Sequence, residues 1–274
     1  MFNLSDVKVD SDPFPHVVID NAIHEDREML MDFPKDSDFG EGVRMHGDLC
    51  WDDLNYEKLI NKSVIYNRFH QYVYSEKFIN DVVNIFKNFY DDELHSNNLL
   101  HDPRIASHQT QPRENRTPPN MNQIEENTDK FILYPRFDIG VGKLNYGLTN
   151  GGGGIHTDNR NRLISILYFL GDDYMIGGEH RLYGVSDNKP FLSKTIKPKH
   201  NRLVISLQTN KALHDVNPVS FIEGSRKAFY LAISSNKSLW NYPSSRILAK
   251  LTRNRYQPTY FERLSEKIYK KLFG

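Results

Sequence analysis

The sequence predicts one domain that is mainly β with flanking helices, on the strength of two observations. Between residues 131 and 235, short β-rich runs follow one another with turn residues between them. Several short strands at this spacing are typical of a β-sandwich or barrel. Before and after this region, apolar residues recur at spacings of three and four, the period of an amphipathic helix. At 274 residues, the chain is long enough for one core with embellishments.

Residues 1–94 are expected to form an opening strand and helices that support the β core. The run at residues 14–20 is rich in β-branched residues and precedes Asn21, so we interpret it as a short strand. A helix is predicted for residues 75–93, because Ser75 is of the type that caps helix N-termini. Its apolar stripe consists of Phe78, Val82, Ile85 and Phe89.

Residues 95–130 differ in composition from both of their neighbours. They are rich in Asn, Gln, Pro, Arg and Glu and show no aliphatic period. A segment of this kind has too little apolar surface to form a packed element. We therefore interpret it as a polar insertion, which could serve as a lid.

The β core is expected at residues 131–235, and a helical tail at residues 236–274. The predicted strands are residues 131–134, 138–144, 163–170, 179–185, 195–196, 202–208, 215–221 and 226–234. In the tail, residues 260–273 are predicted to form a closing amphipathic helix. Its stripe consists of Phe261, Leu264, Ile268 and Leu272.

Composition and charge exclude several classes of protein. Lys plus Arg equals Asp plus Glu at 35 each, so the chain as a whole has no electrostatic attraction to nucleic acid or to an anionic membrane. The longest aliphatic and aromatic stretch, residues 163–170, is too short to span a bilayer. One cysteine, Cys50, allows no internal disulfide, and the N-terminus has no signal-peptide pattern. A cytoplasmic location is therefore expected.

The pattern His156-Thr157-Asp158 predicts a metal site. Side chains alternate in an extended segment, so His156 and Asp158 point to the same side and can reach one ion together. A third ligand should come from another strand, and His214 qualifies because it follows the strand predicted at 202–208 across a short polar turn. Two histidines and one carboxylate on one face of an octahedron leave three positions open. This suits Fe(II) that must bind both a chelating cosubstrate and O₂.

The far carboxylate of such a cosubstrate needs a cation. Arg226, twelve residues after His214, can grip a carboxylate with two parallel hydrogen bonds, which lysine cannot do. A hydroxyl donor usually completes such a clamp. Tyr146, ten residues before His156, is the first candidate for that donor, and Tyr168 is the second.

Each of these residues also has a structural interpretation. His156 and Asp158 lie among Asn, Gly and Thr residues that are typical of a surface turn, and the third ligand could be an ordinary histidine at a strand end. Arg226 could form a salt bridge with Glu223. Tyr146 could be a half-buried tyrosine of a β-barrel. The combination of residue types and spacings favours the metal site.

From residue 143 to residue 234 the sequence resembles the iron(II)/2-oxoglutarate dioxygenase superfamily, most closely its prolyl-hydroxylase-like branch. The resemblance is carried by HTDN at 156–159, ISILYFL at 164–170, GGE at 177–179, KPKHNRLVI at 197–205, HDVNPV at 214–219 and Arg226. The opening run FPHVVID at 14–20 also looks like the first strand of many relatives.

This resemblance implies a double-stranded β-helix, a jelly-roll core of the cupin type, flanked by helices. It implies that His156, Asp158 and His214 ligate Fe(II). It also implies that Arg226 binds 2-oxoglutarate, and Tyr146 stands where related hydroxylases carry a cosubstrate-binding tyrosine. The chain departs from some relatives two residues after the arginine, where they have serine and this chain has alanine.

The expected reaction is hydroxylation of a C–H bond, coupled to oxidative decarboxylation of 2-oxoglutarate with O₂ to succinate and CO₂. By resemblance the substrate is a peptidyl residue of the prolyl type, with a free amino acid or a small metabolite as the alternatives. Asn159, Arg160 and Arg162 follow the first ligands and are candidates for contacts with a polar substrate. Desaturation and ring closure stay open, whereas halogenation is disfavoured because Asp158 is present.

Two other classes of function stay open. One is a jelly-roll binding protein without catalysis, which succinate formation from iron and 2-oxoglutarate would exclude. The other is a zinc hydrolase with the same ligands, which would need a general base and would give the arginine clamp no purpose. The sequence does not predict the oligomeric state.

Overall fold

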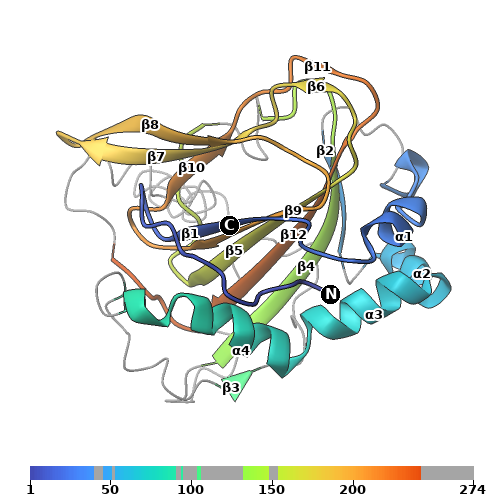
Figure 1. Cartoon of the computed structure of the whole chain (residues 1–274), viewed down its shortest axis with the longest axis horizontal. Coiled ribbons are helices and arrows are strands. Elements are labelled where there is room, and N and C mark those ends of the chain that lie inside the picture. The colour runs from blue at the N-terminus through green and yellow to red at the C-terminus, as the bar shows by residue number, and fades with distance from the viewer. Residues whose placement is uncertain are drawn as a thin grey trace, which may run out of the picture.

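A computed structural model of the chain (Figure 1) describes residues 1–39, 46–50, 53–90, 94, 104–105, 132–147 and 154–241. The described part is mainly β with flanking helices, as predicted. A large sheet faces a smaller one, and helices cover the other side of the large sheet (Figure 1). This arrangement is a double-stranded β-helix, or jelly roll.

The large sheet has seven strands in the order β1-β9-β5-β12-β4-β2, with the short β3 beside β4. Every pair is antiparallel except β3 with β4. Its strands are β1 (His16–Asp20), β2 (His46–Cys50), β3 (Arg104–Ile105), β4 (Ile132–Gly142), β5 (Arg162–Leu170), β9 (Arg202–Leu207) and β12 (Arg226–Ser235). β12 lies between β5 and β4, and its alternating side chains enter both layers of the protein.

The smaller sheet has the strand order β10-β7-β8, and β6 pairs with β11 in a separate ladder. These strands are β6 (Met175–Ile176), β7 (His180–Ser186), β8 (Lys189–Ile196), β10 (Leu213–Val216) and β11 (Phe221–Ile222). β7 and β8 form a hairpin whose turn residues, Asp187 and Asn188, have φ values of 51° and 60°. Asp and Asn tolerate this left-handed conformation, which hairpin turns of two residues require.

In the described residues, the α-helices are α1 (Asp26–Met31), α2 (Leu54–Lys62), α3 (Val64–Val73) and α4 (Glu76–Ile85). Short 3₁₀ helices follow at Asp36–Phe39 and Lys87–Phe89. The hydroxyl of Ser75 accepts a hydrogen bond from the backbone N–H of Phe78 at 3.2 Å, so the predicted N-cap is confirmed. The helix itself ends at Ile85, earlier than predicted, and a 3₁₀ turn follows at Lys87–Phe89.

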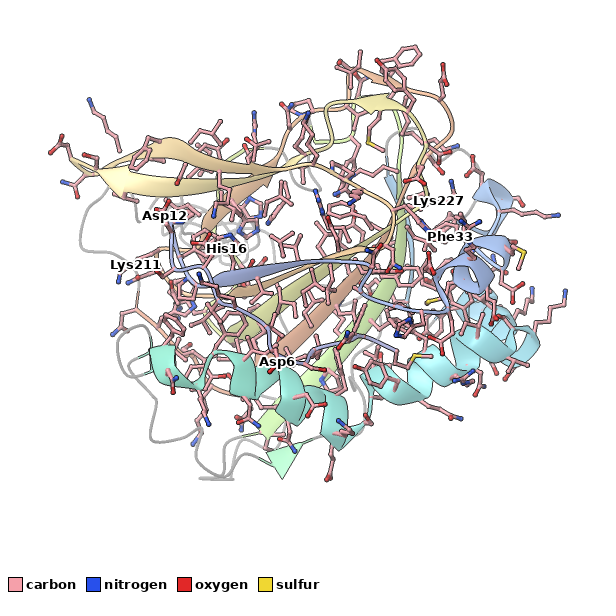
Figure 2. All side chains as sticks on the ribbon, viewed as in Figure 1. Asp6, Asp12, His16, Phe33, Lys211 and Lys227 are labelled. Carbon is pink, nitrogen blue, oxygen red and sulfur yellow. The ribbon has the colours of Figure 1, made fainter. Side chains whose placement is uncertain are left out.

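The main hydrophobic core lies between the large sheet and the helices. The ring of Phe69 on α3 packs against Phe137 of β4 and Phe229 of β12, with centroid distances of 5.1 and 5.4 Å. Figure 2 shows the side chains that fill this layer. Since strand side chains alternate, Ala228 and Tyr230 of β12 face the opposite side, where a second, smaller apolar cluster lies against the small sheet.

The structure corrects the prediction of two strands at residues 131–134 and 138–144. They form the single strand β4, with Pro135 inside it and opposite Ile233 of β12. β2 extends along β4 only as far as Asp138, so Pro135 has a described neighbouring strand on one side only. Such an edge-like position tolerates a residue without a backbone N–H. The predicted strand at 215–221 is divided in a related way, into β10 and β11, around Pro218.

The polar insertion at 95–130, apart from β3, and the closing helix at 260–273 lie outside the described residues. The organisation of residues 1–274 as one domain also stays a prediction. In the described part of the chain, every helix is too short or too polar for a membrane span.

Candidate metal centre and adjoining cavity

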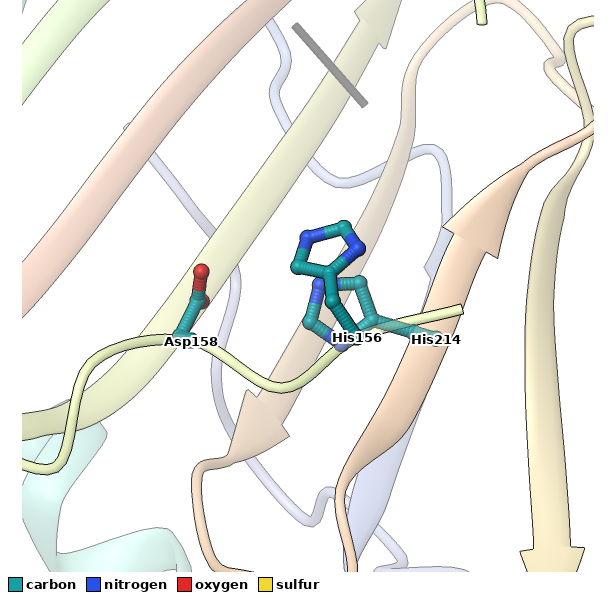
Figure 3. Close-up of side chains that lie close together, drawn as sticks. All are labelled: His156, Asp158 and His214. Carbon is teal, nitrogen blue, oxygen red and sulfur yellow. The ribbon is translucent and has the colours of Figure 1, made fainter. Parts of the chain in front are cut away.

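The structure brings His156, Asp158 and His214 together (Figure 3). His156 and His214 are antiparallel bridge partners: each backbone N–H donates to the other's carbonyl, at 3.0 and 2.8 Å. Asp158 lies two residues after His156 and therefore on the same side of the extended segment. Each of the three side chains offers one ligand atom within 4.8 Å of the other two.

Hydrogen bonds fix the orientation and the neutral tautomer of both imidazoles. Nδ1 of His156 lies 2.9 Å from the carbonyl oxygen of Gly154, and Nδ1 of His214 lies 2.9 Å from that of Ala212. A carbonyl oxygen only accepts hydrogen bonds, so Nδ1 must carry the proton in each ring. Nε2 is thereby left with a lone pair for a metal, which is how second partners orient metal-binding histidines.

The carboxylate of Asp158 is held in its charged form. Its Oδ2 accepts a hydrogen bond from the hydroxyl of Ser165 on β5 and lies 3.7 Å from Nη1 of Arg162. Burial opposes ionisation, but the positive field of Arg162 and the bond from Ser165 outweigh it and hold the pKa of Asp158 well below its usual value. The site therefore combines two imidazole nitrogens with one anionic oxygen donor.

A cavity of about 200 Å³ adjoins these ligands. Apolar side chains from β5, β9, β10 and β12 form much of its wall. The polar groups that line it, besides the ligands, include Tyr146, Arg162, Ser165, His180, Gln208, Arg226 and Tyr230. A concave site with a few convergent polar groups is typical of small-molecule binding.

Arg226 is buried at one part of this cavity, with 1% of its surface exposed. Its Nε donates to the carbonyl of Gly178 at 3.1 Å, and its Nη1 donates to the hydroxyl of Tyr230 at 2.9 Å. Its guanidinium carbon lies 4.7 Å from the ring centroid of Phe169 and 5.2 Å from that of Tyr146. All of these partners are neutral, and Nη2 is buried with no partner among the described residues. The alternative salt bridge to Glu223 is not formed.

Tyr146 lies where the cosubstrate clamp was expected, beside Arg226. It is buried, lines the cavity, and its hydroxyl is 2.9 Å from the hydroxyl of Tyr230. Burial raises the pKa of the Tyr146 phenol well above its usual value, so the group is a neutral hydroxyl. Sequence reasoning missed Tyr230, although it stands four residues after Arg226 in the same strand and so had to share its face.

The structure places Tyr168 elsewhere and corrects its assignment to the cosubstrate site. Its neighbours Leu167 and Phe169 pack in the cluster against the small sheet, so alternation turns Tyr168 to the helix side. There its ring packs against Phe229, with a centroid distance of 5.5 Å, and its hydroxyl donates to Oδ1 of Asn201 at 3.1 Å. Tyr168 is therefore part of the main core.

Of the three substrate candidates, only Arg162 lines the cavity. The backbone carbonyls of Asn159 and Arg160 bind the N–H groups of Arg162 and Leu239, at 2.8 and 2.7 Å, and thereby shape the turn into β5. Gln208, which directly follows β9, was missed. A polar residue at the end of an otherwise apolar strand was the available signal.

Asp215, next to His214, ties β10 to β7. Its two oxygens accept hydrogen bonds from Nε and Nη2 of Arg181, both at 2.7 Å, and both lie 3.1 Å from the hydroxyl of Tyr183. A bidentate pair of this kind fixes geometry as well as adding energy. The strand that carries His214 is therefore held rigidly against its neighbour.

Residues 142–233 match the family model of the 2OG-Fe(II) oxygenase superfamily. This segment contains all three candidate metal ligands together with Arg226 and Tyr146. The resemblance expected from the sequence is thus confirmed over this part of the chain. No curated protein matches the chain significantly.

Among solved structures, the chain is similar to a prolyl 4-hydroxylase from Phytophthora capsici, with 16% identity and a TM-score of 0.46, over 80% of this chain and 58% of that one. The chain thus spans less than two thirds of that protein. It is also similar to a prolyl hydroxylase from Trichoplax adhaerens in complex with a hypoxia-inducible-factor peptide (14%, TM-score 0.41, 80% and 83% covered). A third is the dioxygenase for auxin oxidation of Arabidopsis thaliana with 2-oxoglutarate (14%, TM-score 0.39, 83% and 84% covered).

Proposed function

We propose that this chain is an oxygenase that uses Fe(II), 2-oxoglutarate and O₂ to hydroxylate a C–H bond of a peptidyl residue of the prolyl type, an amino acid or a small metabolite. One observation carries the proposal. A single cavity holds both a His-Asp-His triad and a buried arginine whose described partners are all neutral. The family match of residues 142–233 supports it.

His156, Asp158 and His214 would hold the iron. Two imidazole nitrogens and one carboxylate oxygen fit Fe(II) and leave positions for a chelating oxo acid and O₂. With these bound, the site gains the oxidising chemistry that releases succinate and CO₂. The chain itself orients both imidazoles through their hydrogen bonds at Nδ1, and it keeps the carboxylate of Asp158 ionised before any metal arrives.

Arg226 would bind the far carboxylate of 2-oxoglutarate. A guanidinium that is buried without a counter-charge is costly, and an incoming carboxylate removes that cost. The rings of Phe169 and Tyr146 keep water from the guanidinium, which strengthens its attraction for an anion. Nη2 is the nitrogen that the described structure leaves to this ligand.

The alternative of a zinc hydrolase finds no free carboxylate base among the described residues of this cavity, and it gives the buried Arg226 no purpose. The carboxylates that line the cavity are Asp158, a ligand, and Asp215. Asp215 is occupied by Arg181 and Tyr183, so it is not free to take a proton from water. A silent binding protein would have no need for imidazoles held in the tautomer of metal ligands.

A second polar region of the cavity supports a peptide or amino acid as substrate. Arg162 pairs with Ser234 near the far end of β12 from Arg226, and its Nη1 lies 3.7 Å from Oδ2 of Asp158. The N–H of Gln208 donates to the carbonyl of Leu163, the residue next to Arg162. Nε of Arg162 and Oε1 of Gln208 are both buried without partners among the described residues. One donor and one acceptor suit a substrate that offers both, as amides and amino acids do.

Replacing Gln208 by leucine should raise the KM for substrate by about tenfold, because a buried acceptor for the substrate is lost. Turnover of 2-oxoglutarate without substrate should stay near the wild-type rate, since Gln208 is not a ligand. Gln71→Leu is the matched control, because Gln71 lies on the exposed side of α3, where it binds Asn67. An equal loss of the uncoupled turnover would contradict a role in substrate binding.

The proposed function is tested by succinate release. Protein reconstituted with Fe(II) under anaerobic conditions is mixed with 2-oxoglutarate, O₂ and a panel of prolyl peptides, amino acids and small metabolites. Succinate is expected from the wild type and not from His156→Ala. Metal analysis of anaerobically purified protein separates iron from zinc. Absence of both 2-oxoglutarate binding and succinate across the panel would overturn the proposal.

A further inference from the structure

Tyr230 forms the wall of the cavity between Arg226 and the metal ligands. Both Tyr230 and Arg226 line the cavity from β12. On β5, Tyr230 is opposite Leu167, and the next position on the same face is Ser165, which binds Asp158. A molecule that reaches from the triad to Arg226 therefore runs along the face of β12 that carries Tyr230.

The hydroxyl of Tyr230 links the polar groups at this part of the cavity. It accepts a hydrogen bond from Nη1 of Arg226 at 2.9 Å and lies 2.9 Å from the hydroxyl of Tyr146. Together with the bond from Nε to Gly178, these contacts fix the plane of the guanidinium. A carboxylate that binds Nη2 thus meets an arginine that Tyr230 has already oriented, with a phenolic hydroxyl next to it.

The ring of Tyr230 lies directly on the backbone of β4. A Cβ at Gly140 would overlap Cε2 of Tyr230, and a Cβ at Gly142 would lie 2.9 Å from Cγ of Tyr146. Glycine inside a strand weakens it and often marks a close approach. Because the backbone supports the ring from behind, Tyr230 cannot retreat to make room for a larger ligand.

We propose that Tyr230 determines which 2-oxo acid this protein accepts: its hydroxyl completes the carboxylate clamp with Arg226 and Tyr146, and its ring excludes acids longer than 2-oxoglutarate. The inference rests on the proposed use of a 2-oxo acid. 2-Oxoadipate, which has one more methylene group, would have to displace a ring that is fixed at its hydroxyl and against β4.

Two substitutions separate the hydroxyl from the ring. Tyr230→Phe keeps the ring, so it should weaken 2-oxoglutarate binding by about tenfold or more and still disfavour 2-oxoadipate. Tyr230→Leu removes the ring, so the ratio of the Kd for 2-oxoadipate to that for 2-oxoglutarate should fall by at least about tenfold. Both constants are measured by anaerobic calorimetric titration of Mn(II)-loaded protein, so no turnover is needed.

Tyr168→Phe is the matched control, because Tyr168 is a buried tyrosine of the same sheet whose hydroxyl binds Asn201 outside the cavity. It should bind both acids as the wild type does. Mn(II) content and the thermal midpoint report whether each variant keeps its site and fold, and Tyr230→Met replaces the leucine variant if that one unfolds.

Unchanged 2-oxoglutarate affinity in Tyr230→Phe refutes the role of the hydroxyl, and unchanged rejection of 2-oxoadipate in the ring-less variant refutes the role of the ring. In both cases the wild type still binds 2-oxoglutarate, so the proposed function stands. If metal-loaded wild type does not bind 2-oxoglutarate at all, the proposed function itself fails.

Discussion

Exchange of His214 for alanine is expected to remove bound iron and, with it, succinate formation. Loss of an outer partner of a metal ligand costs roughly 10- to 100-fold in metal affinity, so loss of the ligand itself should exceed about 100-fold. His214 is joined to His156 through backbone hydrogen bonds in both directions, and these do not involve the imidazole. The variant should therefore keep its fold while it loses its metal.

Iron content after anaerobic reconstitution measures this effect, with circular dichroism as the report on the fold. His24→Ala is the matched control, because His24 is exposed at the surface and should leave iron content and turnover unchanged. A His214→Ala protein that retains iron at the wild-type level and still produces succinate would show that the metal is held elsewhere.

The metal ligands could be predicted from the sequence because their arrangement is local. His156 and Asp158 are two residues apart, and alternation alone puts both on one side of an extended segment. The tautomers could not be predicted in the same way. They depend on the carbonyls of Gly154 and Ala212, whose directions follow from the folded backbone.

Tyr168 and Tyr230 mark the limit of this reasoning. Tyr168 lies on the helix side of β5, whereas Leu167 and Phe169 face the small sheet, and the sequence does not distinguish these two faces because both are apolar. Tyr230 stands four residues after Arg226, so its place on the same face of β12 could be predicted from the sequence. Its packing on Gly140 could not be predicted, because this contact depends on the register between β12 and β4, which no local pattern specifies.

Strand limits were predicted least well where burial is weak. β8 runs from Lys189 to Ile196, but only its last two residues were recognised. Phe191 and Leu192 of this strand are 50% and 52% exposed, so successive apolar residues do not mark a buried face. Such strands lack the alternation on which sequence interpretation depends.

Replacing Arg226 by methionine is expected to abolish 2-oxoglutarate binding without unfolding the protein. Removing one partner of a buried ion pair usually costs about 3–5 kcal/mol, because the other charge is left uncompensated. The described partners of Arg226 are a carbonyl, a hydroxyl and two aromatic rings, so no charge is left behind. The lost hydrogen bonds are offset by the desolvation cost of the guanidinium, which disappears with it. The free energy of unfolding without ligand should therefore fall by no more than about 1 kcal/mol.

The free energies of unfolding of the wild type and the Arg226→Met variant should differ clearly only when 2-oxoglutarate is added. Ligand at 100 times its Kd stabilises a folded protein by about 2.7 kcal/mol. A variant that binds 100-fold more weakly gains only about 0.4 kcal/mol at the same concentration. Denaturant unfolding of Mn(II)-loaded protein, with and without 2-oxoglutarate, measures both quantities, and Arg68→Met on the exposed side of α3 is the control.

Arg226→Lys separates charge from geometry in the same experiment. A lysine keeps the positive charge but cannot present two parallel N–H donors or stack flat on Phe169. The increase in its free energy of unfolding on addition of 2-oxoglutarate should lie between the increases for the wild type and the methionine variant. A loss of about 3–5 kcal/mol in the ligand-free methionine variant would instead identify Arg226 as half of a structural ion pair. Full 2-oxoglutarate stabilisation in that variant would show that the carboxylate is held by another group.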